Sequence, residues 1–549
     1  MTEDIDLPVL VVGGGPVGLV ASIGLAQQGL ASLVVERRTA TAAVPAAHVV
    51  NARSFEILRA AGVDMTSIAA ACKSPADAGA VRWVTTLFGD EIGQLPYERQ
   101  GDDVLALTPT PLRNLSQHRL EPILAEHVRK QPLAELLQGW EWISAEQDGE
   151  GVTSQLREVA TGRTRPVQSR YVLAADGAGS PVRRALGIEA IGPARLAAFV
   201  MIHFEADLRA RVGDRPAVLY WTTAAGAGGT FVAHDIDSTW VYMQPFDAER
   251  ESLADYDALR CTEIVRRAMG DPSAPVPIRT ISTWHMTAQV AARYRDGRIF
   301  LLGDAAHRFP PTGGLGLNTG VQDAHNLVWK IAAVEAGWAP ASLLDSYEIE
   351  RQPIARTNAD VSLRNAVKIV EVGKALGSAE DGGRAGRVAA AIANQAEHFD
   401  MLGLQLGFRY ERGALIDDDG PRPTLANPVR EYVPNARPGA RLPHAWLDRD
   451  GARISTLDLL PSDRFTLITG RAGDAWGDAA AAIGGLPLHR IAIGLEVSDP
   501  DGAWAALLGI EPEGALLVRP DQHVAWRSTR AVADRAAALS RAFETILGA

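Results

Sequence analysis

The sequence predicts an α/β protein in which a parallel sheet carries an inserted antiparallel sheet and is followed by a separate α/β domain. Glycine or acidic motifs follow apolar strands at three places, which are Gly13–Gly18, Asp176–Gly177 and Gly303–Asp304. Short aromatic and β-branched segments fill Phe199–Gln244, and strand and helix patterns alternate after a linker at Asp417–Arg441. Alternating strands and helices are typical of parallel sheets, whereas runs of short strands are typical of antiparallel ones.

Length and composition limit the class of protein. At 549 residues the chain exceeds what one hydrophobic core usually supports, so several domains are expected. A formal net charge of -12 and scattered basic residues argue against a nucleic-acid partner. The two cysteines form no CxxC motif, so neither a disulfide framework nor a metal site is expected. The acidic N-terminus and the lack of an apolar run of ~20 residues predict a cytoplasmic protein without a membrane segment.

The first motif reads as a dinucleotide-binding turn. The apolar strand Leu7–Val12 is followed by GGGPVG and an alanine- and leucine-rich helix, which is a Rossmann-like GxGxxG pattern. Gly13 would make the tight turn, Gly15 would admit a pyrophosphate, and Gly18 would let helix and strand pack closely. Pro16 suits the first turn of the helix, whose N-terminus would face the phosphates.

Other residues near this turn are candidate cofactor contacts. A second strand, Ala31–Val35, ends in Glu36, where a carboxylate would accept hydrogen bonds from the adenosine ribose. Arg37 either lies along the adenine or is a solvated charge. Arg53 either reaches phosphate or is a surface helix residue. Gln117, in the first turn of a predicted helix, is favoured as a ligand contact.

Two further apolar strands end in an acidic residue ahead of glycines. Arg170–Ala175 leads into Asp176, and Ile299–Leu302 leads through a glycine into Asp304. Parallel strands place such ends at one edge of a sheet, where open α/β proteins bind their ligands. One large dinucleotide explains the three strand ends more simply than three independent tight turns.

The loop after the last strand suits a flat ligand. Pro311 fixes the backbone, while Gly314 and Gly316 let the main chain approach without a Cβ in the way. A helix is predicted from Asn318 onward. Amides from Gly316 through Leu317 to Asn318 would then point from a helix N-terminus at an electron-rich group.

The inserted antiparallel sheet is the natural cover for the reactive part of such a ligand. Its period-2 alternation does not reveal which face turns inward. The candidate substrate contacts are Tyr220, Trp221, Tyr242 and Gln244, together with Pro311 of the loop.

These patterns divide the chain into seven segments. Residues 1–76, 105–190 and 285–416 are expected to form the nucleotide-binding domain, 77–104 and 191–284 the substrate domain, 417–441 a linker, and 442–549 a C-terminal α/β domain.

The GxGxxG turn, the DG motif at Asp176–Gly177 and the GD motif at Gly303–Asp304 followed by HRFPPTGGLGLN resemble class A, single-component FAD-dependent monooxygenases. The resemblance covers essentially the whole chain. It is nearest to the phenol and aromatic polyketide hydroxylases, which carry a C-terminal thioredoxin-like domain, here without redox cysteines. The fold that it implies is the p-hydroxybenzoate-hydroxylase type.

The resemblance also implies a cofactor arrangement. FAD would have its ribose on Glu36, its pyrophosphate at Gly13–Gly18, its ribityl chain near Gln117 and Asp304, and its isoalloxazine ring against Pro311 and Gly314–Asn318. NADPH or NADH would reduce it, and the segment at Asp176 would serve both nucleotides. Relatives often carry an arginine where this chain has Ala46, so either Arg53 or another cation compensates, or FAD is held more loosely.

The implied activity is hydroxylation of a phenolic or polyketide-derived aromatic substrate by O2 through a flavin C4a-hydroperoxide. A base near the phenol is expected, with His234 and His285 as candidates. Antibiotic biosynthesis and phenol catabolism both fit, and a homodimer is left open. Two alternatives remain, namely a Baeyer–Villiger or epoxidising flavin monooxygenase and a non-catalytic flavin-fold binding protein.

Overall fold

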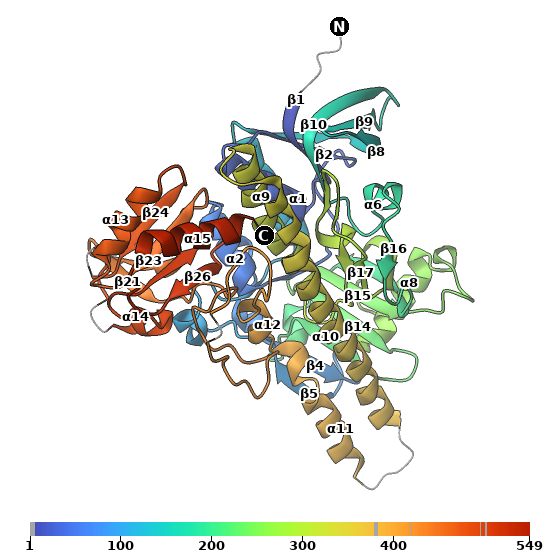
Figure 1. Ribbon diagram of the computed structural model, residues 1–549. Helices are drawn as coiled ribbons and strands as arrows, with labels where there is room; N and C mark the ends of the chain where they lie inside the picture. Colours follow the sequence, from blue (N-terminus) through green and yellow to red (C-terminus); the bar gives the residue numbers. More distant parts are fainter. Residues whose placement is uncertain (1–5, 378–382, 419, 495, 500–501, 549) are drawn as a thin grey trace.

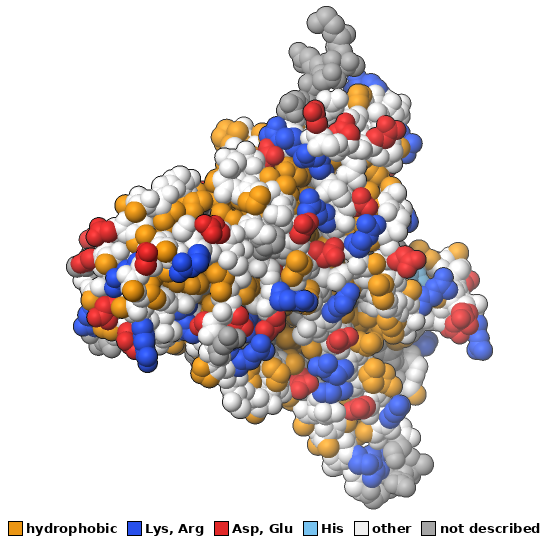
Figure 2. All heavy atoms as spheres, viewed as in Figure 1, with side chains coloured by type: hydrophobic (Ala, Val, Ile, Leu, Met, Phe, Trp, Pro, Cys, Tyr) orange, Lys and Arg blue, Asp and Glu red, His pale blue; other side chains and the backbone are white. Residues whose placement is uncertain are grey.

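The computed structural model describes residues 6–377, 383–418, 420–494, 496–499 and 502–548. Its parts are a parallel sheet with its helices, an antiparallel sheet beside α8 (Ala258–Met269), and a C-terminal domain that lies against α9 (Leu315–Glu335) and α2 (Ala52–Ala60) (Figure 1). Acidic and basic side chains are interspersed over the face seen in Figure 2. Within the described ranges, every helix is too short or too polar to cross a bilayer.

The parallel sheet has the strand order β18-β19-β10-β1-β2-β7. Its strands are β1 (Asp6–Val12), β2 (Ser32–Glu36), β7 (Ala134–Gln138), β10 (Thr164–Ala174), β18 (Arg295–Asp296) and β19 (Ile299–Leu301), and β8 (Trp140–Gln147) and β9 (Val152–Glu158) extend it through β10. β1 runs parallel to both β2 and β10, and β10 runs parallel to β19. The carboxyl ends of these four strands therefore lie along one edge.

Both faces of this sheet are buried, which explains its uninterrupted apolar strands. α1 (Pro16–Gln27) packs against both α5 (Gln117–Arg129) and α9 (Leu315–Glu335). Val9, Leu10 and Val11 are completely buried as a result. The expected helix at the GD loop begins at Leu315 rather than Asn318, because Gly314 takes a left-handed N-cap conformation with φ +63°.

The inserted sheet has the strand order β16-β12-β15-β14-β13-β4-β5. Its strands are β4 (Ala80–Val84), β5 (Glu91–Pro96), β12 (Ala197–Glu205), β13 (Leu219–Thr222), β14 (Gly229–Asp235), β15 (Thr239–Pro245) and β16 (Ile278–Met286). All neighbours are antiparallel except β4 and β13, which are parallel. Helix α8 (Ala258–Met269) covers one face, and its Cys261 and Val265 share a core with Ile202 and Phe231 of the sheet.

The C-terminal domain has a four-stranded sheet with the order β24-β23-β25-β26. Its elements are β21 (Trp446–Arg449), β22 (Ala452–Ser455), β23 (Phe465–Thr469), α13 (Asp474–Ile483), β24 (Leu488–Ala492), α14 (Ala503–Leu508), β25 (Ala515–Val518), β26 (Val524–Ser528) and α15 (Arg535–Leu547). Its core continues into the domain of the parallel sheet, since Trp329 and Ala333 of α9 share one cluster with Phe465 and Phe543.

Smaller elements complete the chain. They are α2 (Ala52–Ala60), α3 (Met65–Ala71), α4 (Pro75–Ala78), α6 (Pro181–Ala185), α7 (Arg209–Val212), α10 (Ser346–Gly377), α11 (Arg384–Ala393), α12 (Leu402–Leu406), β3 (Val49–Val50), β6 (Arg113–Asn114), β11 (Ala190–Ile191), β17 (Gln289–Ala291) and β20 (His307–Arg308). α10 runs through Pro353 without a break. The carbonyl that loses its partner there belongs to Ile349, which is exposed, so water can bind it.

Candidate functional site

The β1–α1 turn contains two glycines that the fold requires and one glycine that faces open space. Gly13 has φ +108°, and an added Cβ would lie 2.2 Å from the carbonyl oxygen of Ala175. A Cβ on Gly18 would lie 1.9 Å from the carbonyl oxygen of Gly13. At Gly15, the N-cap of α1, no protein atom lies within 4 Å of an added Cβ. That space adjoins the unpaired amides of the helix N-terminus, as a pyrophosphate site requires. Pro16 opens the helix and lacks an amide hydrogen.

Glu36 is a buried anion at the end of β2. Its Oε2 accepts the N–H of Gly14 at 2.8 Å, and its Oε1 accepts the backbone N–H and the Nε–H of Arg38. Burial raises the pKa of this carboxyl, but the hydrogen bonds from Arg38 and Gly14 outweigh burial and leave the pKa below its usual value. Arg37 is exposed and pairs with no carboxylate in the described chain. The arginine that fixes Glu36 is therefore Arg38, which sequence reasoning missed although it lies two residues away.

Asp304 stands beside the start of α9. Its side chain reaches solvent, and its Oδ1 lies 3.9 Å from where a Cβ of Gly316 would be. Desolvation by the surrounding protein raises the pKa of the Asp304 carboxyl, and the electrostatic effects of the neighbouring His307 and Arg308 partly offset that shift. Because α9 begins at Leu315, the first-turn amides of Leu315, Gly316 and Leu317 lack intrahelical partners and carry partial positive charge. A carboxylate acceptor and several amide donors thus share one end of the helix.

The loop before α9 is held against β3. A Cβ on Gly314 would lie 2.5 Å from Cβ of Val49, so only glycine fits there. The Asn318 side chain donates to the carbonyls of Val49 and Gly314 and accepts the N–H of Asn51 at 2.9 Å. Asn318 therefore braces the loop instead of offering a free amide. Pro311 is exposed at the tip of the loop.

Asp176 and Gln117 border the same strand edge. Asp176 Oδ2 accepts the N–H of Val182 at 3.0 Å, while its Oδ1 is buried without a hydrogen-bond partner in the described chain. Burial raises the pKa of Asp176. Such an unsatisfied buried acceptor fits a donor from a bound ligand. The Gln117 side chain, in the first turn of α5, donates to Glu121 Oε1 at 2.6 Å.

Arg53 does not reach the cofactor site, so that part of the prediction is wrong. Its guanidinium is completely buried and donates to Glu56, to the Gln522 side chain and to the carbonyl of Asp521. The face of α2 that carries Arg53 packs against the C-terminal domain, and a local motif does not reveal a partner so distant in sequence. Arg53 therefore does not compensate for Ala46, which is exposed.

The predicted substrate contacts lie on opposite faces of the inserted sheet, so they do not line one pocket. Tyr220 and Tyr242 are buried on the α8 side, where their hydroxyls donate to the carbonyls of Arg215 and Ala227. Alternation along β15 places Gln244 on the side of Tyr242. Trp221 points to the other face. His285 is exposed on the α8 side, next to Phe246.

The face opposite α8 carries a row of partly exposed apolar side chains. Phe199, Met201, Leu219, Trp221 and Met243 belong to it, together with Thr230. Trp221 stacks on Trp83 with ring centroids 4.9 Å apart, and both share a cluster with Val49, the residue that touches the glycine loop. This face therefore turns toward the loop. The side chains that pack on α8 identify one face of the sheet, and the alternation along each strand then assigns the remaining side chains to the opposite face.

His234 lies on this same face, two residues beyond Val232. Its Nδ1 is 2.7 Å from Ser116 Oγ, and its ring centroid is 5.5 Å from that of His48 and 6.3 Å from that of His118. Burial, followed by the electrostatic effects of His48, His118 and Lys73, lowers the pKa of His234 well below its usual value. The ring is therefore neutral. In the described chain, no group of three or more metal-ligating side chains is placed to hold a metal.

The hydroxyl of Ser116 bonds His234 rather than the helix that Ser116 begins. Ser116 is the N-cap of α5, yet its side chain does not cap the helix. Its hydroxyl bonds His234 instead. Giving up an N-cap bond costs about 1 kcal/mol, so the orientation of His234 is maintained at some expense to the helix.

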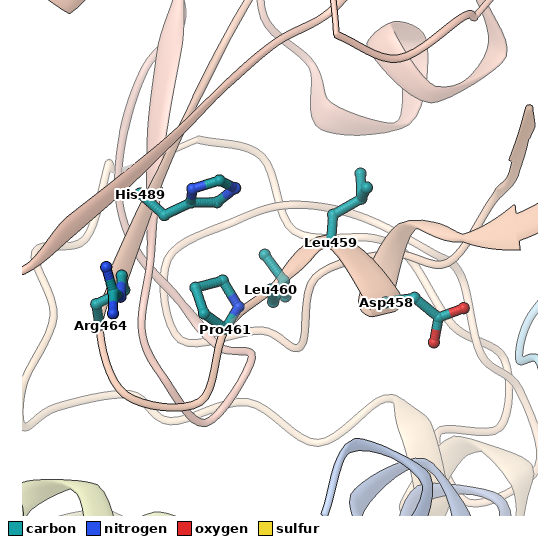
Figure 3. A pocket seen from close by; sticks show the side chains of 6 residues that line it. All are labelled: Asp458, Leu459, Leu460, Pro461, Arg464 and His489. Carbon is teal, nitrogen blue, oxygen red and sulfur yellow. The ribbon is translucent and has the colours of Figure 1, made fainter. Parts of the chain in front are cut away.

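A surface depression of about 300 Å³ lies elsewhere, in the C-terminal domain (Figure 3). Its lining residues are Asp458, Leu459, Leu460, Pro461, Arg464 and His489. The Asp458 carboxylate points away from Arg464 and His489, and it pairs with Arg59 of α2. This depression contains no member of the strand edge described above.

Comparisons with known proteins agree with this geometry. Residues 6–362 match the family model described as FAD binding domain, and residues 435–549 match that described as aromatic-ring hydroxylase, C-terminal. The chain is 34% identical to 2,4-dichlorophenol 6-monooxygenase of Delftia acidovorans, over 96% of this chain and 95% of that one. It is 35% identical to tetracenomycin A2 monooxygenase-dioxygenase of Streptomyces glaucescens, over 99% and 97%.

Solved structures give the same result. The flavin-dependent monooxygenase PieE in complex with FAD and substrate matches with a TM-score of 0.92 and 37% identity, over 99% of both chains. Aklavinone-11 hydroxylase with FAD and aklavinone matches with a TM-score of 0.83 and 33% identity, over 100% of both chains. The predicted family, fold class and FAD cofactor are confirmed. The chain belongs to the FAD-dependent aromatic-ring hydroxylases, a family of flavoprotein monooxygenases.

Proposed function

We propose that this chain uses NADPH or NADH to hydroxylate a phenolic or polyketide-derived aromatic ring. The balance is ring C–H, O2, NAD(P)H and a proton giving ring C–OH, NAD(P)+ and water. Bound FAD supplies the hydride acceptance and the oxygen activation. The observation that carries the proposal is the apolar face opposite α8, which turns toward the glycine loop and carries the neutral ring of His234. A cytoplasmic location and a homodimer stay predictions.

The residues proposed to hold FAD surround the strand edge. They are Gly13, Gly15, Pro16, Gly18, Glu36, Gln117, Asp176, Asp304, Pro311, Gly314, Gly316, Leu317 and Asn318, with the last acting as a brace. The α1 amides would hold the pyrophosphate. The first-turn amides of α9 would stabilise negative charge on the ring system without reorganising, which is the main way that a protein lowers such a barrier.

The substrate is proposed to lie between Pro311 and the apolar face. Trp221, Met201 and Met243 offer a flat, polarisable surface for an aromatic ring and exclude water from it. Thr230, between Met243 and Trp221 in register, is the polar member of this row. None of these four is cationic, which favours a neutral substrate over a carboxylate.

His234 is proposed as the base for the phenol hydroxyl. In the neutral tautomer that carries its proton on Nδ1, the ring donates to Ser116 Oγ and leaves the Nε2 lone pair free to accept a proton. Nε2 forms no hydrogen bond with the described residues. Removing the phenol proton makes the ring a better nucleophile toward an electrophilic oxygen.

His234→Gln should lower the hydroxylation rate by about a hundredfold near pH 7, because general-base catalysis contributes that much. The wild-type imidazole stays neutral as a base from pH 6 to 8, so its rate should change little there. The variant should instead gain activity as pH rises and the phenol ionises unaided. Rates measured by product formation across this pH range test the role, with FAD content and substrate-free NAD(P)H oxidation as checks on folding.

His285→Gln is the matched control, since His285 is exposed on the far side of the sheet, and it should behave as wild type. A His234→Gln enzyme with the wild-type rate and pH profile would refute the assignment of the base.

Stopped-flow spectroscopy tests the proposed reaction. FAD-loaded protein is reduced without oxygen and mixed with ¹⁸O2 and a panel of simple and polycyclic phenols. A transient flavin absorbance that decays as a singly ¹⁸O-labelled phenol appears is the expected result. Reoxidation that releases only hydrogen peroxide with every aromatic tested would favour a flavin-binding protein. A labelled ester or epoxide would favour the Baeyer–Villiger or epoxidising alternative.

A further inference from the structure

The loop between β25 and β26 inserts between helices α2, α9 and α10 of the FAD-binding domain. We call residues Arg519–His523 the RPDQH segment after their sequence. Its four polar side chains are almost completely buried, with exposed fractions of 1% to 2%. Gln522 has φ +67°, a left-handed conformation that side chains other than glycine rarely adopt. A strained backbone and several buried charges in one loop call for an explanation beyond packing.

The first set of contacts ties this segment to α9 and α10. The Arg519 guanidinium donates to both carboxylate oxygens of Glu350, at 2.7 and 2.9 Å. Lys330 of α9 donates to the same carboxylate at 2.7 Å. Asn326, one turn earlier on α9, donates to Glu350 at 2.6 Å and to Asp521 at 3.4 Å. α9 therefore meets the segment directly through Asn326, whereas Lys330 is linked to it through Glu350.

The second set of contacts ties the segment to α2. Arg53 donates from Nη2 to the carbonyl of Asp521 at 2.9 Å and from Nη1 to the Gln522 side chain at 2.6 Å. The left-handed conformation of Gln522 thus places its side-chain oxygen where it accepts a hydrogen bond from α2.

α2 and α9 meet again at the glycine loop before α9, which contains Pro311 and Gly314 and which we call the flavin loop. Asn51, the N-cap of α2, donates its N–H to Asn318 of α9 at 2.9 Å. Asn318 also holds the carbonyl of Gly314 in the loop. The two helices are joined at their starts by Asn318 and further along by the RPDQH segment, and both lie beside the C-terminal domain in Figure 1.

We propose that the RPDQH segment is a positioning element for the flavin loop, through which the C-terminal domain sets the spacing of α2 and α9. Asp521 and Gln522 are its positioning residues, and they act through Asn326 and Arg53. Stability alone does not account for this choice of side chains, because apolar residues of similar volume would stabilise a buried interface at least as well. Directional bonds to two helices fix a geometry that apolar packing leaves adjustable. The role rests on FAD binding and holds whichever substrate the enzyme oxidises.

Gln522→Gly is the sharpest test, because glycine accepts φ +67° without strain while removing the acceptor for Arg53. The FAD dissociation constant should rise about tenfold, the size of effect seen when a coupling network without ligand contact is cut. The visible circular dichroism of bound flavin should change, and more hydrogen peroxide should form per NAD(P)H oxidised. The apoprotein should unfold at nearly the wild-type temperature. Asp521→Asn should shift the flavin signals in the same direction.

Asp458→Asn is the matched control. The Asp458–Arg59 pair also joins the C-terminal domain to α2, at 2.7 Å, but it is half-exposed and has no bond to α9. FAD affinity and the dichroism spectrum should match wild type in this variant. Wild-type FAD affinity in Gln522→Gly, or an equal loss of affinity in both variants, would overturn the proposal and leave the segment a structural contact.

Discussion

Gly15→Ala is expected to give a folded protein that retains FAD poorly. Gly15 has φ -75° and ψ -180°, which alanine adopts without strain, and no protein atom lies within 4 Å of the added Cβ. The methyl group would instead occupy the space in front of the α1 amides, where the pyrophosphate is proposed to pass. Overpacking of this kind costs about 1–3 kcal/mol, which corresponds to a loss of affinity of up to roughly a hundredfold. Titration of the apoprotein with FAD, followed by fluorescence, measures the change.

Substitutions at two other glycines are the controls for this experiment. Gly149→Ala adds a methyl group at another position without neighbours within 4 Å, in the turn between β8 and β9, and should change neither FAD affinity nor stability. Gly18→Ala should prevent folding, because its Cβ would lie 1.9 Å from the carbonyl oxygen of Gly13. Normal FAD affinity in Gly15→Ala would show that the pyrophosphate does not use this turn.

Asp323→Asn should lower the free energy of unfolding by about 3–5 kcal/mol, the usual cost of removing one partner from a buried ion pair. Asp323 is completely buried on α9 and accepts from the N–H of Gly303, from His307 and from Arg351. Burial raises the pKa of Asp323, but His307 and Arg351 outweigh that effect and lower it. The change removes the carboxylate that pairs with Arg351 among the described residues. Urea unfolding at pH 7 measures the loss.

The pH dependence of this variant has a definite sign. Because the folded pKa of Asp323 is depressed, its stabilisation is fully present above the unfolded value of about 3.9 and is lost as pH falls through the folded value. The difference between wild type and Asp323→Asn should therefore shrink in acid. Glu141→Gln, which breaks the exposed pair with Arg157, should change stability by less than about 0.5 kcal/mol. Equal stability of wild type and Asp323→Asn at pH 7 would contradict the prediction.

The strand-end motifs could be predicted because their geometry is local. A Cβ on Gly13 or Gly18 would lie too close to backbone atoms of the protein, so both positions require glycine. The two glycines stand within six consecutive residues, and the motif is therefore visible in the sequence. The fold class followed because each such turn implies a parallel strand and a helix. Because parallel strands end at one edge of the sheet, the sequence also predicted that Glu36 and Asp304 lie along that edge.

The parts that failed depend on partners far away in the sequence. Arg53 bonds Gln522, which is 469 residues later, and no local pattern distinguishes such a contact from phosphate binding. Tyr220 and Trp221 are adjacent on one strand, so only the packing of α8 decides which of them turns toward the glycine loop. Ser116 bonds His234, which is 118 residues later, and the sequence around either residue gives no sign of that contact. Tertiary packing between segments distant in the sequence decided each of these outcomes.

The parallel pairing of β4 with β13 has a consequence for biosynthesis. The carbonyl of Val84 receives its hydrogen bond from Thr223, 139 residues later. At a translation rate of about 5–20 residues per second, β4 is made roughly 7–28 s before its neighbour β13 is complete. An unpaired strand edge is a template for aggregation during that interval. Yield of native enzyme in a cell should therefore depend on chaperone capacity and growth temperature more than on the final stability of the fold.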